Sequence, residues 1–251
     1  MAGLESPRPE NQGILMIRFA KIWIALLALG VLILAGVARA DPIHIVAFGD
    51  SNTAGFGVTE KNTYPAQLER ALKAKGYDVE VTNSGVSGNT SSRALSRFDD
   101  AIPEDTDIAI VFFGRNDVRW GVDDAKLRAN LDSIVRRLRE RKIEVILAGF
   151  HPKDFSEIAA AHDAIYYPDF FAGVASDGVK DPKYVLFWDL IGHLNTAGYQ
   201  EIVSRMSPLV ETAVTKVYCN RLEEAAFLAP ECNAPGRQPI VTGSTEKTVT
   251  R

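Results

Sequence analysis

The chain has 251 residues, of which 46% are hydrophobic and 24% are charged, and its net charge at pH 7 is −4. This is the composition of an ordinary globular protein, so it excludes an intrinsically disordered chain and a disulfide-rich scaffold. No basic stripe runs along the sequence, and we therefore do not expect nucleic acid as a partner.

The first 40 residues have the pattern of a signal peptide. Two basic residues precede an apolar run over residues 22–37, and residues 38–40 (Ala-Arg-Ala) place small side chains at the two positions that a signal peptidase reads. The run is shorter than the ~20 residues that a membrane span usually needs. We expect a secreted or periplasmic protein cleaved after Ala40; a retained N-terminal membrane anchor is the alternative, and Met16 is an alternative start. Cleavage would remove four basic and two acidic side chains and leave a net charge of −6.

From residue 43 onward, short β-branched runs alternate with longer amphipathic stretches. The predicted strands are residues 43–48, 79–82, 108–113 and 143–148, and the predicted helices are residues 64–75, 90–98, 124–141, 155–164 and 195–217. Gly76 is placed to end the first helix, and Asn195 is placed to cap the last one. Strands that alternate with helices predict one parallel sheet covered by helices on both faces.

The C-terminal part contains both cysteines, Cys219 and Cys232. An exported protein meets an oxidising compartment, which favours a disulfide between them; two unrelated thiols are the alternative. The Pro, Gly, Ser and Thr content of the last 19 residues is typical of a disordered tail. The predicted organisation is a signal peptide over residues 1–40, one globular domain over residues 41–218 and a C-terminal extension over residues 219–251.

Four polar segments occupy positions where a parallel sheet could place a site. They are residues 48–52 (Phe-Gly-Asp-Ser-Asn), 83–90 (Asn-Ser-Gly-Val-Ser-Gly-Asn-Thr), 114–117 (Gly-Arg-Asn-Asp) and 189–195 (Asp-Leu-Ile-Gly-His-Leu-Asn). The first three follow predicted strands, and open α/β sheets bind ligands outside the carboxyl ends of their strands. Each segment taken alone could equally be a helix cap, a turn or a surface loop.

The residue types in these segments are those of acyl transfer. Ser51 follows the first strand, where Gly49 allows the backbone to turn sharply, and the glycines of the second segment allow backbone N–H groups to approach a ligand. The Asn116 amide can donate to a developing oxyanion, and His193 can take the Ser51 proton. In a sheet of order 2-1-3-4-5, strands 1 and 3 flank the switch point, so Ser51 and Asn116 should face one crevice.

Together these segments resemble the four conserved blocks of the SGNH (GDSL-like) hydrolases, in order and in approximate spacing. The resemblance is carried by residues 49–51 (Gly-Asp-Ser), Gly88, residues 114–117 (Gly-x-Asn-Asp) and His193, and it covers roughly residues 43–218. The chain looks most similar to the arylesterase, thioesterase and lysophospholipase L1-like branch. The resemblance implies an α/β fold, a three-layer α/β/α flavodoxin-like sandwich with a parallel sheet.

The resemblance also implies residue roles. Ser51 would be the nucleophile, and His193 would be the general base and then the general acid. The oxyanion hole would consist of the Ser51 N–H, the Gly88 N–H and the Asn116 side chain. The expected reaction is hydrolysis of an ester or thioester through an acyl-enzyme, without a metal or cofactor, and the expected partner is a small ester, thioester, lipid or acylated-glycan substrate.

The last block departs from the family pattern. The family places an aspartate three residues before the histidine, where this chain has Leu190, and the nearest carboxylate is Asp189. Gly192 could allow a one-residue bulge that still brings Asp189 to the ring. Alternatively, a backbone carbonyl orients the ring, or Asp181 or another distant carboxylate replaces the missing aspartate.

The substrate is less readable from the sequence. We expect Arg119 and Trp120 at the rim of the site, whereas Phe170 and Phe171 are expected to pack in the core, with an acyl pocket as the alternative. An exported carboxylic-ester hydrolase is the leading interpretation. A carbohydrate O-acetyl esterase and a non-catalytic domain that binds a glycan or lipid are the alternatives.

Overall fold

The structure is a computed structural model that describes residues 41–224. The predicted signal peptide, the alternative start at Met16 and Cys232 with the predicted tail lie outside these residues. The cleavage and the disulfide with Cys219 therefore stay predictions. None of the helices between residues 41 and 224 combines the length and apolar character that crossing a bilayer requires.

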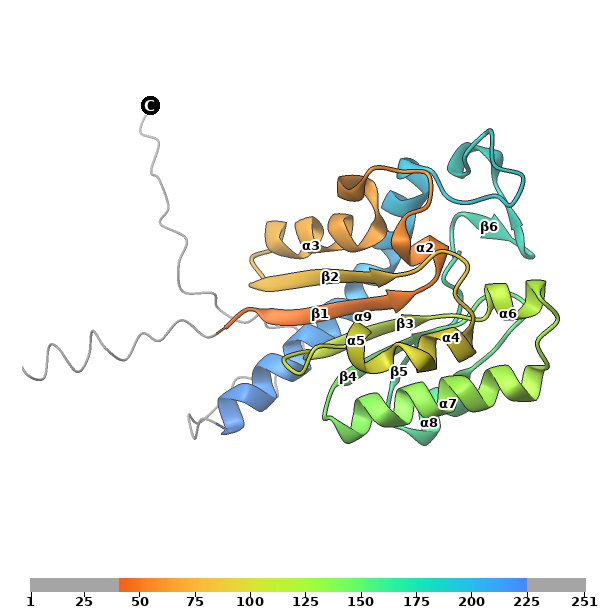
Figure 1. Cartoon of the computed structure of the whole chain (residues 1–251). Helices are drawn as coiled ribbons and strands as arrows, with labels where there is room; N and C mark the ends of the chain where they lie inside the picture. Colours follow the sequence, from red (N-terminus) through yellow and green to blue (C-terminus); the bar gives the residue numbers. More distant parts are fainter. Residues whose placement is uncertain (1–40, 225–251) are drawn as a thin grey trace, which may run out of the picture. The chain divides into compact units, whose positions relative to one another are not determined.

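A parallel sheet of five strands forms the centre of the described chain (Figure 1). Its order is β2-β1-β3-β4-β5, the order of the doubly wound sheet considered above, and each neighbouring pair is parallel. The strands are β1 (Ile43–Gly49), β2 (Val79–Gly85), β3 (Ile108–Phe112), β4 (Glu144–Ala148) and β5 (Ile165–Tyr167). Every residue of β3 and β4 is buried, because helices cover both faces of the sheet.

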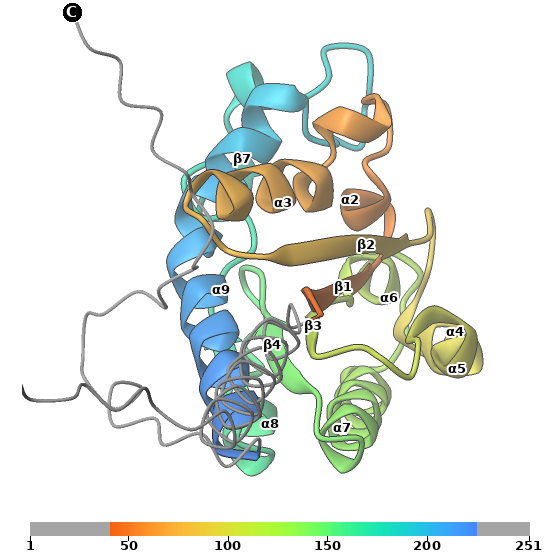
Figure 2. The ribbon, with the colours of Figure 1, turned by 90° about the vertical axis from the view of Figure 1, so that its left-hand side faces the viewer.

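Helices form a layer on each face of the sheet, as Figure 2 shows along the strands. One layer contains α3 (Tyr64–Ala74) and α9 (Thr196–Glu224), and the other contains α4 (Ser91–Ser96), α5 (Phe98–Ala101) and α7 (Asp124–Glu140), with α8 (Ser156–Ala161) packed beside α7. The three-layer α/β/α architecture that the resemblance implied is therefore confirmed.

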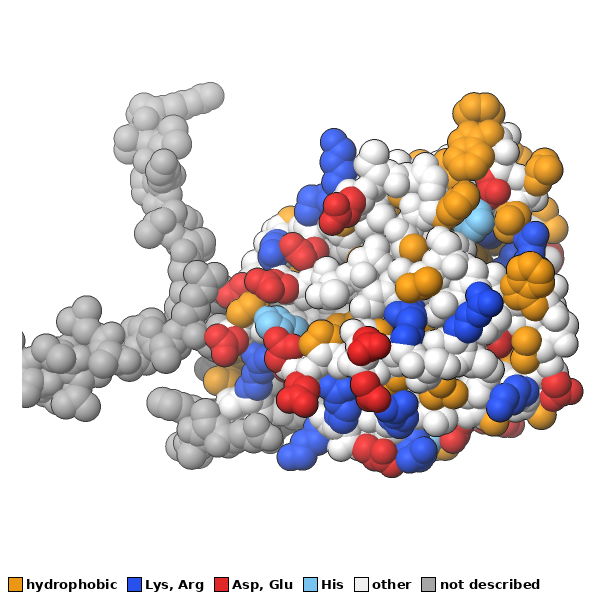
Figure 3. Space-filling model, in the orientation of Figure 1, with side chains coloured by type: hydrophobic (Ala, Val, Ile, Leu, Met, Phe, Trp, Pro, Cys, Tyr) orange, Lys and Arg blue, Asp and Glu red, His pale blue; other side chains and the backbone are white. Residues whose placement is uncertain are grey.

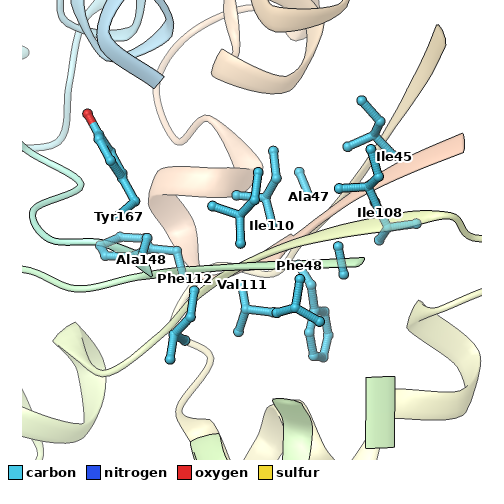
Figure 4. Packing of buried hydrophobic residues seen from close by; sticks show 14 of the residues in the cluster. Ile45, Ala47, Phe48, Ile108, Ile110, Val111, Phe112, Ala148 and Tyr167 are labelled. Carbon is cyan, nitrogen blue, oxygen red and sulfur yellow. The ribbon is translucent and has the colours of Figure 1, made fainter. Parts of the chain in front are cut away.

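Side chains of the central strands alternate between the two layers. In Figure 4, Phe48 and Val111 point to one side of the sheet, and Ile45 and Ile110 point to the other. The Phe48 ring makes an edge contact with Phe98, at 6.2 Å between ring centroids. Fully burying a large apolar side chain stabilises a fold by roughly 1.5–3 kcal/mol. This packing fixes the ends of β1 and β3, and with them the residues that follow.

Most predicted elements are present, with differences at their ends. The predicted helix over residues 90–98 is two short helices, because Arg97 leaves the helical conformation between α4 and α5. The predicted helix over residues 155–164 is shorter, and the last helix continues to Glu224. Asn195 caps α9 as expected: its Oδ1 accepts the Gly198 N–H at 2.9 Å.

The connection between β5 and α9 contains structure that the sequence pattern did not indicate. A small antiparallel hairpin joins β6 (Ala175–Ser176) to β7 (Val179–Lys180), and the 3₁₀ helix η2 (Pro182–Tyr184) follows it. Another 3₁₀ helix, η1 (Glu60–Asn62), precedes α3, and β5 itself was not predicted. Strands of two or three residues are too short to give a recognisable alternation.

Candidate active site

Ser51 lies where β1 ends and the short helix α2 (Ser51–Ala54) begins. Asp50 caps this helix, since its Oδ1 accepts the Asn52 N–H at 2.8 Å. The capping role considered for this segment therefore belongs to Asp50 and leaves the Ser51 side chain available. Ser51 is only 8% exposed, and it lines a cavity at the carboxyl edge of the sheet.

Gly49 has a different role from the expected one. The sequence interpretation was a sharp turn, but Gly49 is the last residue of β1 and is not among the glycines with positive φ. A Cβ at this position would overlap the Thr53 side chain of α2, and it would lie 3.0 Å from the Phe112 carbonyl oxygen of β3. The glycine is therefore required by close packing of α2 and β3 against β1.

The structure brings Ser51, His193 and Asp189 together. The His193 Nε2 atom lies 2.9 Å from Ser51 Oγ, and His193 Nδ1 lies 2.6 Å from Asp189 Oδ2. A carboxylate can only accept from an imidazole nitrogen, so Nδ1–H donates to Asp189 and Nε2 is left to accept from the Ser51 hydroxyl. All three side chains are shielded from solvent. This arrangement is able to withdraw a proton from the serine hydroxyl.

The one-residue shift of the carboxylate is accommodated by the backbone at Gly192. Its φ is +77°, a conformation that favours glycine, and its N–H donates to the Asp189 carbonyl at 3.1 Å. This brings the Asp189 carboxylate to the Nδ1 atom of the ring, and the His193 backbone N–H also donates to the carboxylate at 2.6 Å. Leu190, at the position where the family has its aspartate, points into solvent and is fully exposed.

Asp181, the other carboxylate considered, does not contact His193. It caps η2 by accepting the Lys183 N–H at 3.0 Å, and it pairs with the Lys183 ammonium at 3.2 Å. Of the two aspartates, the structure therefore places only Asp189 against the ring.

The Asp189 carboxylate is held in its charged form. Burial by itself would raise its pKa, but hydrogen bonds from the His193 backbone and ring and from the Ile191 backbone outweigh burial, and the pKa is lowered. A charged carboxylate against Nδ1 favours the tautomer described above and stabilises a protonated ring.

The three expected oxyanion donors line the same cavity. Within residues 41–224, the backbone N–H groups of Ser51 and Gly88 have no protein acceptor. The Asn116 amide donates to the Asn89 carbonyl at 2.9 Å and lies 3.4 Å from Asp50 Oδ2, which is a long and weak contact. Two backbone donors without an acceptor thus lie in the cavity that contains Ser51, and one of the two contacts of the Asn116 amide is weak.

Two buried aspartates for which no role was predicted support this arrangement. Asp50 is completely buried; burial raises its pKa, opposed by hydrogen bonds from Asn52 and by the charges of His193 and Arg115. Asp117 accepts the Ser91 N–H at 2.9 Å and the Ser91 hydroxyl at 2.5 Å, which joins α6 (Arg115–Arg119) to the start of α4. The resemblance included both positions, so the sequence did contain a signal for them.

The cavity has a volume of about 520 Å³ and an apolar rim. Its large apolar side chains are Phe56, Val118, Trp120, Leu190 and Ile191, and its cations are Arg115, Arg119 and Lys180. Figure 3 shows hydrophobic side chains gathered around a histidine at the end of the molecule where Figure 1 places α6 and β6. Arg119 and Trp120 thus lie at the rim of the cavity, as expected.

Phe170 and Phe171 are buried in the core and do not line the cavity. Phe170 stacks on Phe112 with 4.0 Å between ring centroids. Phe56, whose ring lies 4.5 Å from the His193 ring, and Lys180 were not predicted as site residues. Neither lies in a recognisable segment, so no signal in the sequence pointed to them.

Parts of the chain are similar in sequence to known esterases. Esterase TesA from Pseudomonas aeruginosa is 32% identical over 122 residues, which are 48% of this chain and 60% of that protein. An arylesterase from Vibrio mimicus is 26% identical over 125 residues, 49% of this chain and 62% of that protein. The matched part thus spans about 60% of the length of these curated relatives.

Solved structures match over a larger share. AlinE4, described as an SGNH-hydrolase family esterase, is 32% identical; the match covers 70% of this chain and 98% of that chain, with a TM-score of 0.55. The crystal structure of TesA matches with a TM-score of 0.58 over 68% of this chain and 99% of that chain, and at 24% identity it supports the fold alone. The model of the GDSL-like lipase/acylhydrolase family matches residues 47–201, and the chain belongs to this family.

Proposed function

We propose that the chain is an exported serine esterase that hydrolyses carboxylic esters or thioesters through an acyl-enzyme on Ser51. The observation that carries the proposal is the contact of His193 with Ser51 on one side, at 2.9 Å, and with Asp189 on the other, at 2.6 Å. Export rests on the pattern of residues 1–40 alone.

The first half of the reaction forms the acyl-enzyme. Ser51 Oγ attacks the carbonyl carbon of the substrate while its proton passes to His193 Nε2, and the carbonyl π electrons move onto oxygen. The resulting oxyanion accepts from the N–H groups of Ser51 and Gly88 and from the Asn116 amide. Collapse of this intermediate expels the alkoxide or thiolate, which takes the proton from His193.

The second half releases the acid. Water attacks the acyl-enzyme while its proton passes to His193, and the new oxyanion collapses to expel Ser51, which regains its proton. Through both halves, Asp189 keeps the ring in the required tautomer and stabilises its protonated form. No step needs a metal or cofactor.

The cavity supports an acyl or aryl group in the substrate. Its apolar side chains, among them Phe56 and Trp120, would remove such a group from water, which contributes roughly 25 cal/mol for each Å² buried. A polysaccharide would leave these side chains without an apolar partner. An acyl or aryl ester is therefore the favoured substrate, and activity assays distinguish it from a carbohydrate O-acetyl esterase and from a non-catalytic binding domain.

The test is hydrolysis of p-nitrophenyl esters from acetyl to palmitoyl by the wild type and by Ser51→Ala. We expect the wild type to turn over several chain lengths and Ser51→Ala to lose roughly a factor of 10⁶ in kcat, as when a triad nucleophile is removed. The matched control is Ser96→Ala, an exposed serine of α4 that does not line the cavity. Full activity in Ser51→Ala, or no labelling of the wild type by a fluorophosphonate, would contradict the proposal. Activity on acetylated xylan alone would favour the carbohydrate esterase.

A further inference from the structure

Two cations of the cavity lie over one aromatic ring. Lys180 Nζ is 4.2 Å from the centroid of the Phe171 ring, and Arg115 Cζ is 5.4 Å from the same centroid. Lys180 comes from the hairpin strand β7, and Arg115 comes from the start of α6 beside Asn116. Both line the cavity that contains Ser51 and His193. We call Arg115 and Lys180 the cation pair.

The cation pair forms no ion pair with a carboxylate of the described residues. Across residues 41–224, neither side chain forms an ion pair, and the Arg115 guanidinium has no hydrogen-bond acceptor. Lys180 Nζ donates to a neutral group, the Gly192 carbonyl, at 2.6 Å. The nearby carboxylates of Asp50 and Asp189 instead accept from Asn52 and from the His193 ring.

This arrangement carries an electrostatic cost in the absence of substrate. Burial, and then the charge of Arg115, lowers the pKa of Lys180 to about 8, although Asp50 and Asp189 act in the opposite direction. Two like charges beside one ring in a half-buried position repel each other, and an anion bound by both would relieve this repulsion. The chain without its first 40 residues is acidic overall, so the three cations that line the cavity do not reflect a basic chain.

The position of the cation pair indicates which part of the substrate it would meet. Lys180 contacts the residue directly before His193, which under the proposed function protonates the departing alcohol. Arg119, over the Trp120 ring at 5.9 Å, adds a third cation at the cavity rim. We propose that the enzyme prefers carboxylic esters whose alcohol moiety carries an anionic group, a carboxylate or a phosphate, which Arg115 and Lys180 bind. This inference rests on the proposed esterase function.

The test compares acetate release from three matched esters. The probes are 4-acetoxybenzoate, 4-acetoxyphenyl phosphate and, as the neutral reference, methyl 4-acetoxybenzoate. The measured quantity is kcat/KM for each anion divided by kcat/KM for the neutral ester, which cancels general effects of a substitution on the catalytic residues. We expect Arg115→Met to lower this ratio roughly tenfold, the size expected for loss of one hydrogen bond to a charged group, and Arg115→Lys to retain part of it.

Further variants keep the test decisive. Lys180→Met should also lower the ratio. Because Lys180 also donates to the Gly192 carbonyl, Lys180→Arg is included as the variant that keeps a cation at this position, and it should retain the ratio. Lys126→Met, which removes an exposed lysine that does not line the cavity, should leave the ratio unchanged. If the ratio falls in Arg115→Met and Lys180→Met for only one of the two anionic esters, the anionic group of that ester is the class that the site recognises.

The outcomes separate this inference from the proposed function. If the wild type hydrolyses no ester, both fail. If it hydrolyses the neutral ester and the ratio stays within about twofold of the wild type in Arg115→Met and Lys180→Met, only the anion subsite is overturned, since loss of a charged hydrogen bond predicts a larger change.

Discussion

The candidate site consists of two halves that are held in different ways. One half follows β1 and β3 and contributes Ser51 and Asn116, on short helices whose ends are fixed by the buried sheet. The other half is the connection over residues 175–195, which contributes Asp189 and His193. This connection contains strands of only two residues and exposes large apolar side chains, including Phe187 and Leu190.

Individual polar contacts hold the second half. Leu186 donates its N–H to the His193 carbonyl at 2.9 Å, and Asn195 donates its side-chain amide to the carbonyls of Lys183 and Val185. A net hydrogen bond contributes only about 1 kcal/mol, whereas packing of the sheet involves many buried side chains. Substitutions that displace Asp189 or His193 should therefore lower activity by more than their effect on the stability of the fold explains.

The largest expected effect comes from the carboxylate in the connection. Asp189→Asn should lower kcat on an activated ester by roughly 10⁴, because an amide at this position favours the wrong ring tautomer. Asp181→Asn, which removes a carboxylate of the same connection that binds Lys183 and not His193, should remain within about twofold of the wild type, as surface substitutions usually do. The measurement is kcat for both variants, with thermal unfolding as the control for stability.

A contrary result would be informative. Equal rates for Asp189→Asn and the wild type would mean that a backbone carbonyl orients the ring, which would leave a Ser–His dyad. A loss in Asp181→Asn alone would mean that the connection rearranges in solution.

The two halves also differ in how far the sequence predicts them. The central strands, and the positions of Ser51 and Asn116 after them, follow from continuous apolar runs such as residues 108–113, since a buried strand leaves little freedom to the residue after it. In the connection, Asp189 was one of three alternatives. Its place depends on the positive φ of Gly192, which the glycine itself suggested, and on the bond from Lys180 to the Gly192 carbonyl. Lys180 and Gly192 are twelve residues apart in sequence, and no local pattern predicts that bond.

A substitution at Gly192 provides the next test of how the connection positions its catalytic residues. Gly192→Ala places a side chain at φ +77°, which costs about 1–2 kcal/mol of strain or shifts the backbone that carries Asp189 and His193. We expect about a tenfold loss of kcat, since small displacements of catalytic groups are costly. The matched control is Gly76→Ala at φ +91°, far from the cavity; a Cβ at either glycine would meet no atom closer than 3.9 Å.

The control separates strain from catalytic geometry. Gly76→Ala should lower the melting temperature by a similar amount and leave kcat unchanged. If both variants lose activity equally, the loss reflects stability, and the positioning role of Gly192 is wrong.

The smallest expected effect concerns the charge of Lys180. Its pKa is lowered to about 8, by burial first and by Arg115 second, so the side chain is a cation below this pH and becomes neutral as the pH rises through it. Asp50 and Asp189 are the carboxylates that face it, and arginine side chains stay charged over this range. The preference for an anionic over a neutral ester should therefore be present at about pH 7 and fall several-fold by about pH 9.5, because one of two cations is lost.

Two variants distinguish Lys180 from other titrating groups. Both esters use the same Ser51 and His193, so titration of the catalytic residues changes the two rates together and cancels in their ratio. In Lys180→Arg the cation persists at high pH, and the ratio should stay constant between these pH values. Lys126→Met should reproduce the wild-type fall. A pH-dependent ratio that survives in Lys180→Arg would assign the titration to another group, and the connection would then contribute only catalytic residues to the site.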